Sequence, residues 1–164
     1  MTENDLMNLK DGTLQWWMIV KPKSQHDRYK GERAELRRCH STTDVMFIPS
    51  YHLLLEKTNA DKKDSEILHQ LAVIAWVLSW VDGETDTEFA KSLANTDPQF
   101  SMMRFRRLLA SDDWDDLGVQ LIRALKFTKR RANVSDLIWS IMRWKRGNAK
   151  ENWAMSYYGS VKEV

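Results

Sequence analysis

The sequence is poor in the residues that mark several special classes of protein. Its 164 residues include one cysteine, three prolines and six glycines. Because Cys39 has no second cysteine to pair with, the chain forms no intramolecular disulfide, which fits a reducing compartment. The low proline and glycine contents exclude collagen-like chains and Pro/Gly-rich disordered chains. A chain of this length can instead bury a core without disulfides or metal ions.

Long apolar segments are also missing. The most apolar stretch, Leu71–Leu78, has eight residues, whereas a helix that spans a bilayer needs roughly 20. Met1–Lys10 carries Glu3 and Asp5 where a signal peptide carries lysine or arginine, and no apolar core follows. We therefore expect a cytoplasmic protein that does not bind membranes, with Leu71–Leu78 as part of a buried helix.

Tryptophan is abundant where those other residues are scarce. The chain has eight tryptophans, against roughly two at average usage. Apolar residues recur at three- and four-residue steps through most of the chain, which is the period of a helix with one buried face. The period predicts helices at Thr13–Val20, Glu32–His40, Ser50–Lys57, Ser65–Val81, Glu88–Asn95, Met102–Ala110 and Asp113–Lys129, after Ala132 up to Trp144, and at Lys150–Tyr158.

Nothing in the sequence alternates with period two over a stretch long enough to predict a strand. We therefore predict an all-α fold, a compact bundle of about seven to nine helices with no sheet. We expect a single helical domain over residues 1–164, with an N-terminal half at about 1–82 and a basic C-terminal half at about 83–164.

The net charge of +2 hides a strong segregation along the chain. Residues 1–100 hold 12 basic and 16 acidic side chains, a net charge of −4, whereas residues 101–150 hold 12 basic and 5 acidic ones, a net charge of +7. The last fourteen residues carry a net charge of −1. Because the local field governs attraction to a polyanion, one surface of this nearly neutral chain can be strongly basic.

Within residues 101–150 the basic side chains recur at helical spacing. Residues three, four or seven positions apart share one face of a helix, so three successive helices are each expected to carry a cationic stripe. Arginine predominates among them, and its planar guanidinium suits bidentate contacts to phosphate. The stripes consist of Arg104 and Arg107; of Arg123, Lys126 and Arg130; and of Arg143, Arg146 and Lys150.

A structural explanation is open for each stripe taken alone. Cationic stripes are most often solvated faces, and Lys126–Arg131 lie where a helix C-terminus favours positive charge. The aspartates that flank Trp114 lie where a helix N-terminus favours negative charge, so we assign them dipole and capping roles. These aspartates are Asp112, Asp113, Asp115 and Asp116. Three adjacent cationic stripes together favour a functional surface.

Candidates for catalysis are scarce. The histidines, at positions 26, 40, 52 and 69, show no metal-ligand spacing with one another or with Cys39. The chain has no glycine-rich phosphate loop and no nucleophile elbow. Tryptophans at helical intervals are more typical of a core or an interface than of base-stacking platforms, and this applies to Trp76, Trp80, Trp139 and Trp144. The sequence therefore predicts a binding protein and not an enzyme, with no metal and no cofactor.

Several short strings occur in an order that resembles one protein family. They are GERAELRR at residues 31–38, PSYHLL at 49–54, SLAN at 92–95, RFRRLL at 104–109, Trp144, and WAMSYY at 153–158. In this order, in an all-helical chain of this length, they resemble the CasB family, the small subunit of the type I-E CRISPR surveillance complex Cascade. The resemblance runs from about Gly31 to Tyr158. Two positions depart from the family pattern: Lys145 stands where glycine is frequent, and Ser156 where an acidic residue is.

The resemblance implies a non-catalytic subunit, present as a pair along the inner side of a complex assembled on crRNA, where it helps to hold opened target DNA. Its implied partners are crRNA, target DNA, the backbone and large subunits of Cascade and a second copy of itself, in the cytoplasm of a prokaryote. When the guide RNA pairs with the target strand, the hybrid that forms is about as stable as the DNA duplex that it replaces. Protein contacts to phosphates can therefore favour the open R-loop and its displaced non-target strand. A groove of arginine and lysine that follows the backbone would serve any target sequence.

We therefore predict a nucleic-acid-binding surface from the basic stripes and the first motif. The candidate phosphate contacts are Arg37, Arg38, Arg104, Arg107, Arg123, Lys126, Arg130, Arg143 and Arg146. Arg106 and Arg131 are second-rank because their places on the helical wheel differ. Aromatic residues of the C-terminal segment are expected to pack its helices or to meet a neighbouring subunit. These are Trp139, Trp144, Trp153, Tyr157 and Tyr158.

Two other functions stay open at this point. A helix-turn-helix regulator would use Leu117–Lys129 as its first helix and Ser135–Arg146 as its recognition helix, which needs side chains free to reach base edges. The apolar Leu137 and Ile141 predict instead that this second helix faces the core. A metal-dependent nuclease would use the aspartates around Trp114.

Overall fold

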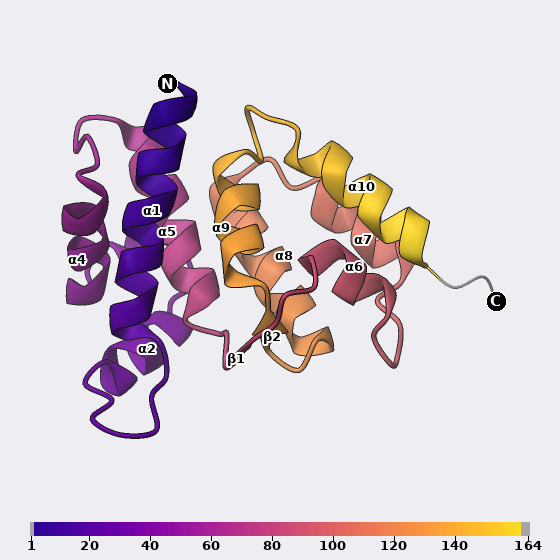
Figure 1. Cartoon of the computed structure of the whole chain (residues 1–164). Helices are drawn as coiled ribbons and strands as arrows, with labels where there is room; N and C mark the ends of the chain where they lie inside the picture. Colours follow the sequence, from indigo (N-terminus) through magenta and orange to yellow (C-terminus); the bar gives the residue numbers. More distant parts are fainter. Residues whose placement is uncertain (1, 162–164) are drawn as a thin grey trace. The chain divides into compact units, whose positions relative to one another are not determined.

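The computed structural model describes residues 2–161, and within them ten helices and one pair of short strands (Figure 1). The chain divides into two compact units, Met1–Trp80 and Val81–Val164. The all-α prediction is broadly confirmed, with one helix more than the upper end of the predicted range. Residues 1 and 162–164, at the ends of the predicted single domain, lie outside the described residues, and one domain stays a prediction.

The first unit contains five helices. They are α1 (Glu3–Val20), α2 (Lys30–Arg37), α3 (Thr42–Val45), α4 (Pro49–Thr58) and α5 (Ser65–Leu78). α1 packs along α4, and α5 packs against α3 and α4 (Figure 1). α5 lies at the centre of this unit's core, because every residue from Leu71 to Leu78 is buried. The expected buried helix is therefore confirmed, although it ends at Leu78 and not at Val81.

α1 begins ten residues before the predicted start at Thr13, because its first turn is capped. The Thr2 hydroxyl accepts a hydrogen bond from the Asp5 N–H at 3.1 Å, and the Asp5 carboxylate accepts one from the Thr2 N–H at 2.9 Å. The Thr2 hydrogen bonds favour the charged carboxylate and lower the pKa of Asp5. This capping box satisfies two free N–H donors at the helix start and extends the helix through a polar segment.

α1 and α4 approach closely at Gly12. A Cβ atom at this position would lie 2.4 Å from the Lys57 carbonyl oxygen and 2.8 Å from the Thr58 Cα atom. Both are backbone atoms of α4, so neither can rotate away. Thr13 and Thr58 are buried at this contact, and each hydroxyl donates to a carbonyl oxygen of its own helix. The packing of the two helices therefore requires glycine at position 12.

Gly12→Ala is expected to lower the free energy of unfolding by about 3 kcal/mol, because the added methyl group forces the two helices apart. Gly31→Ala is the matched control, since Gly31 also lies in a helix and nothing lies within 4 Å of its missing Cβ atom. This control should be neutral or stabilising by up to about 1 kcal/mol. Urea unfolding followed by circular dichroism measures both. Equal stability of the two variants would contradict the close contact.

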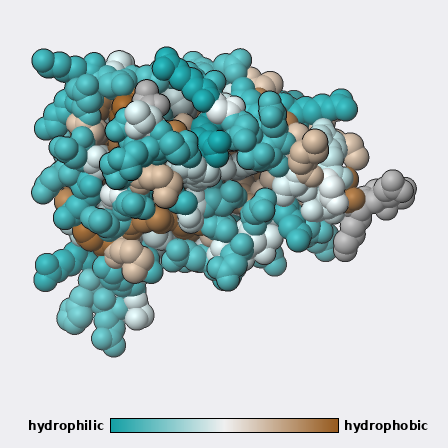
Figure 2. All heavy atoms as spheres, turned by 45° about the horizontal axis from the view of Figure 1, so that its top comes forward, coloured by the Kyte–Doolittle hydropathy of each residue, from teal (hydrophilic) through white to brown (hydrophobic). Residues whose placement is uncertain are grey.

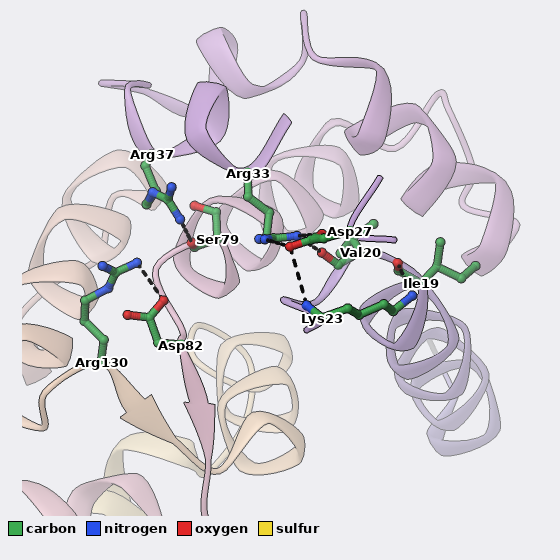
Figure 3. A network of polar contacts seen from close by, with 9 residues as sticks. All are labelled: Ile19, Val20, Lys23, Asp27, Arg33, Arg37, Ser79, Asp82 and Arg130. Carbon is green, nitrogen blue, oxygen red and sulfur yellow. Dashed lines mark hydrogen bonds and ion pairs between the residues drawn. The ribbon is translucent and has the colours of Figure 1, made fainter. Parts of the chain in front are cut away.

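The first motif of the family resemblance contributes a buried arginine to this unit. The Arg33 guanidinium forms two parallel hydrogen bonds to the Asp27 carboxylate, one of them at 2.7 Å, and donates to the Val20 carbonyl oxygen at 2.8 Å (Figure 3). The hydrogen bond from Arg33 lowers the pKa of Asp27 to about 2. Arg33 thereby fastens the loop after α1 to α2, which is a structural role.

The second unit contains two strands and five helices. They are β1 (Gly83–Glu84), α6 (Phe89–Ala94), α7 (Met102–Leu109), α8 (Trp114–Phe127), β2 (Arg131–Ala132), α9 (Val134–Met142) and α10 (Ala149–Ser160). α10 packs against α6 and α9, and α7 packs against α8 (Figure 1). The ring of Tyr157 stacks on that of Phe105 with centroids 4.0 Å apart, so α10 also holds α7.

Aromatic side chains fill the core of the second unit. Trp144 and Trp153 are buried edge to face, with ring centroids 5.1 Å apart. Trp144 Nε1 donates to the Ser111 carbonyl oxygen at 2.9 Å, and Trp153 Nε1 donates to the Ser140 hydroxyl at 2.8 Å. The indole N–H groups of these two buried tryptophans thus both have a partner, as is typical of polar atoms in a core. Among the remaining predicted packing residues, Tyr157 is buried, Trp139 half-buried and Tyr158 exposed.

The prediction of no sheet is wrong at one point. β1 pairs with β2 in parallel, with Gly83 opposite Arg131 and Glu84 opposite Ala132. The Thr85 N–H continues the pairing by donating to the Ala132 carbonyl oxygen at 3.1 Å. Two-residue strands are too short to show an alternating pattern, which is why periodicity did not predict them.

Apolar side chains on the surface are few and local. Figure 2 shows hydrophilic side chains over most of the visible face, with apolar side chains in smaller patches. In the described part of the second unit, the large exposed apolar side chains lie on α7 and α10, and they include Met103 at 73% and Met155 at 80% exposure. No helix within residues 2–161 combines the length and apolar character needed to cross a membrane.

Candidate nucleic-acid interface

A groove formed by α7, α8 and Phe100, which lies two residues before α7, brings together four of the predicted basic residues. It has a volume of about 250 Å³ and seven lining residues, of which four are cationic and none is acidic. They are Phe100, Arg104, Arg107, Gln120, Arg123, Lys126 and Phe127. We call this feature the basic groove; all of it belongs to the second unit.

Helix periodicity brings the four cations to the surface. On α7, Phe105 and Leu108 are buried, which leaves Arg104 and Arg107 exposed one turn apart. α8 repeats the pattern, with three leucines buried and its two groove cations exposed. Helical spacing thus accounts for the exposure of each pair. The packing of α7 on α8 brings the two pairs together in one groove.

Two phenylalanines line the same groove. The rings of Phe100 and Phe127 meet edge to face, with centroids 5.1 Å apart. The Arg104 guanidinium carbon lies 5.1 Å from the centroid of the Phe127 ring, within the range of a cation–π contact. Phe100 is buried and Phe127 is half-buried, so the groove offers part of the Phe127 ring beside its cations, a combination that suits an unpaired nucleic-acid strand.

The charges of the basic groove have one sign. No carboxylate among the lining residues offsets the four cations, so the groove carries a positive potential that attracts a polyanion. Three of the four cations are arginines, whose fork of N–H donors can contact one phosphate through two hydrogen bonds. These are the properties of a site that contacts phosphates.

Arg130 does not lie on the α8 face that the spacing predicted. α8 ends at Phe127, and Lys129 and Arg130 have positive φ angles of 56° and 62°, so the chain turns away from the helix axis. The Arg130 guanidinium forms an ion pair with Asp82 at 3.1 Å (Figure 3). The predicted stripe through Arg130 is therefore wrong, because it continued the helix beyond its end.

The third predicted stripe is also broken. α9 ends before Arg143 and α10 begins before Lys150, so Arg143, Arg146 and Lys150 do not share a helix. The Arg143 guanidinium lies 5.0 Å from the centroid of the Trp139 ring, and Arg146 is exposed in the turn between the helices. Lys150 Nζ lies 2.9 Å from the Asp112 carboxylate, and this hydrogen bond lowers the pKa of Asp112.

The other predicted basic residues lie apart from the groove lining. Arg37 and Arg38 belong to the first unit, where Arg37 donates to the Ser79 carbonyl oxygen at 3.2 Å and Arg38 is exposed (Figure 3). The second-rank residues lie in the second unit, Arg106 exposed on α7 and Arg131 on β2. Four of the nine predicted contacts thus line one groove, and the other five lie elsewhere.

The neutral residues of the groove, Phe100, Gln120 and Phe127, were not predicted from the sequence. A signal for the phenylalanines was present, because Phe100 precedes Arg104 by four residues and Phe127 directly follows Lys126. Aromatic residues interleaved with cations are typical of single-strand-binding surfaces. The helical spacing of the tryptophans predicted core or interface positions for them, and no stacking role was predicted for a phenylalanine.

α9 does not fit the recognition helix of a helix-turn-helix regulator. Every residue from Val134 to Met142 is buried or half-buried, so this helix presents no exposed face to base edges. The connection from α8 to α9, residues 128–133, contains β2 and is not the short turn of that motif. The structure therefore disfavours the regulator.

Three of the four aspartates around Trp114, at positions 113, 115 and 116, lie at the start of α8, as predicted, whereas Asp112 lies outside the helix. The Asp113 carboxylate accepts hydrogen bonds from the N–H groups of Asp115 and Asp116, at 2.7 and 3.3 Å, and so caps the helix. Asp112 pairs with Lys150. Within residues 2–161, no three histidine, cysteine, aspartate or glutamate side chains are grouped in a way that could hold a metal ion.

Fold and groove together define a helical protein whose second unit presents a cationic, aromatic-lined groove of the kind that suits a polyanion. Residues 32–158 match the protein family described as CRISPR-associated protein Cse2. The chain belongs to this family. The match confirms the resemblance to CasB, since Cse2 and CasB designate the same family.

A solved structure shares the fold. A chain in the crystal structure of E. coli Cascade bound to a PAM-containing dsDNA target with a 32-nt spacer, at 3.20 Å resolution, matches with a TM-score of 0.66 and 17% sequence identity. The match covers 96% of this chain and 98% of that chain. The two chains therefore have the same fold over nearly their whole lengths. No curated protein matches the chain significantly.

Proposed function

We propose that the protein is the non-catalytic small subunit of a crRNA-guided type I-E Cascade surveillance complex, and that it binds the nucleic-acid backbone without sequence specificity. In this role it stabilises the R-loop and the displaced non-target strand during antiviral defence in the prokaryotic cytoplasm. Membership of the Cse2 family and the fold shared with a chain of E. coli Cascade support this role. The observation that carries it is the basic groove, with four cations and no carboxylate.

The energetics of target opening explain how such a groove acts. The RNA–DNA hybrid that forms is about as stable as the DNA duplex that it replaces. A small additional binding free energy from protein contacts therefore decides whether the R-loop stays open. Each phosphate that a groove arginine neutralises releases condensed counterions and adds to the stability of the open state. Because phosphates are the same at every position, this contribution does not depend on the target sequence.

The proposed partners are crRNA, target DNA, the backbone and large subunits of Cascade, and a second copy of this chain. The exposed Met103 and Met155 support contacts with neighbouring subunits, because methionine is enriched at protein interfaces. The subunit contributes binding and no chemistry in this proposal. The aspartates that a nuclease would need serve instead as a helix cap and as an ion-pair partner.

Co-expression of the chain with its genomic neighbours tests the proposed assembly. We expect a tagged chain to co-purify with a short repeat-derived RNA in a large assembly, because the complex forms on crRNA. The same tagged chain expressed without its neighbours is the control and should elute as a small species without that RNA. Failure of the co-expressed chain to join an RNA-containing assembly would contradict the proposed function.

A further inference from the structure

A second hollow of the second unit adjoins the basic groove at Phe127. It has a volume of about 570 Å³, and it is formed by the loop after β1, by α6 and the segment after it, and by the end of α8 with β2. Its lining includes the cations Lys91, Lys129 and Arg131, the carboxylate of Asp97, and Phe127. Because Phe127 lines both features, the groove and the second hollow adjoin at this residue.

Cations outnumber carboxylates in the second hollow by three to one. Lys91, Lys129 and Arg131 are exposed there, and Asp97 is the acidic residue of the lining. Thr85, Thr87 and Ser92 also line the hollow, and hydroxyl groups of this kind donate hydrogen bonds to phosphate oxygens. The Thr96 and Thr128 hydroxyls donate instead to the carbonyl oxygens of Leu93 and Leu125. The hollow therefore has the charge and the donors that a phosphate backbone requires.

The main chain at the three cationic residues belongs to defined parts of the fold, and one of the three cationic groups is itself held by a hydrogen bond. Lys129 lies at the chain reversal after α8, with a φ of 56°. The Arg131 guanidinium donates to the Glu84 carbonyl oxygen at 3.1 Å, which ties it to the neighbouring strand. At the end of α6, the Asn95 amide donates to the Lys91 carbonyl oxygen at 2.9 Å. The second hollow is thus lined by residues of defined elements, and among its cations the Arg131 guanidinium is held in place by a carbonyl oxygen.

We propose that one unpaired nucleic-acid strand runs from the basic groove across Phe127 into the second hollow. Its phosphates lie on the cations of both features, and an unstacked base lies against the Phe127 ring. Seven cations and one carboxylate then follow the strand. A duplex keeps its bases stacked and cannot use the ring, so the path selects a single strand. This proposal rests on the proposed function, because it extends the same backbone-binding site.

The test uses the purified full-length chain and a fluorescent oligothymidylate of about 20 nucleotides, titrated over a salt series. Lys91→Gln combined with Lys129→Asn removes two charges from the second hollow, and asparagine tolerates the positive φ at position 129. We expect the slope of log Kobs against log salt concentration to fall by about 1.4, with a loss of affinity of roughly tenfold. The matched control, Lys62→Gln with Lys63→Gln, removes two exposed lysines of the first unit and should leave both values unchanged.

A groove variant separates failure of this proposal from failure of the proposed function. Arg104→Gln, Arg107→Gln and Arg123→Gln are combined and measured in the same assay. If the groove variant loses affinity and the Lys91/Lys129 variant does not, the strand stops at Phe127: the extended path is overturned and the proposed function stands. If neither variant loses affinity, or the unaltered chain does not bind, both are overturned. If the Lys91/Lys129 variant is unfolded by circular dichroism, Lys91→Gln alone should lower the slope by about 0.7.

Phe127→Leu tests the crossing point itself. Leucine keeps an apolar side chain against Phe100 but removes the stacking surface, so affinity for the oligothymidylate should fall about tenfold while the salt slope stays the same. Affinity for a DNA duplex of equal length should not change. An unaltered affinity for the single strand, or an equal loss for the duplex, would overturn the path across Phe127.

Discussion

Replacing Arg104, Arg107 and Arg123 with glutamate is expected to weaken retention of target DNA by the assembled complex about 100-fold at physiological salt. The basic groove then holds three carboxylates and one cation in place of four cations, so it repels the backbone that it is proposed to bind. All three residues are exposed, so their replacement removes no buried side chain. Retention is measured by filter binding or gel shift with unrelated target sequences.

Assembly of the complex provides the internal reference for this experiment. The triple variant should co-purify with crRNA and the other subunits as the unaltered chain does, because its changes lie in the groove. Lys30→Glu, Lys62→Glu and Lys63→Glu form the matched control, with the same change in net charge at exposed sites of the first unit. Equal retention by the two triple variants would contradict the groove, and a loss confined to some target sequences would indicate base reading.

Tyr157→Ala is expected to destabilise the second unit by about 4 kcal/mol. Tyr157 is fully buried, its ring stacks on Phe105 with an interplanar angle of 9°, and its hydroxyl donates to the Phe100 carbonyl oxygen. Burial raises the pKa of the Tyr157 hydroxyl, which keeps it protonated and able to donate. The side chain thus anchors both α7 and a lining residue of the basic groove to α10. Thermal unfolding followed by circular dichroism measures the loss.

Two further variants divide this effect into its parts. Tyr157→Phe keeps the stacked ring and removes only the hydroxyl, so it should cost about 1 kcal/mol. Met155→Ala changes a side chain of the same helix that is 80% exposed, and it should stay within about 0.5 kcal/mol of the unaltered chain. A Tyr157→Ala variant as stable as Met155→Ala would contradict the anchoring role.

Helical periodicity predicted most of the fold, because amphipathic segments such as Met102–Leu109 bury one face whatever their neighbours are. It failed where short polar signals decide the structure. The capping box of Thr2 and Asp5 starts α1 in a segment without an apolar stripe. The short α3 depends on Ser41, whose hydroxyl accepts from the Asp44 N–H. Local hydrogen bonds of this kind leave little trace in a hydrophobic pattern.

The candidate site was predictable one helix at a time but not as a whole. Helical spacing predicted that Arg104 and Arg107 share one exposed face, and that Arg123 and Lys126 share another, because each pair lies on one helix. The prediction from spacing was wrong for Arg130, because the predicted helix continued beyond Phe127, where α8 ends. The meeting of α7 with α8, and of the basic groove with the second hollow, depends on tertiary packing that no local pattern specifies. Lys91 was not predicted either, because it lies among the first hundred residues, whose net charge is negative.

The salt dependence of binding tests the central claim most directly. For the assembled complex, log Kobs for single-stranded DNA is plotted against log salt concentration with the unaltered chain and with the Arg104→Gln, Arg107→Gln, Arg123→Gln variant. If the basic groove contacts phosphates through these three arginines, the slope becomes less steep by about 2, by the same amount for unrelated sequences. An unchanged slope would contradict a phosphate-binding groove.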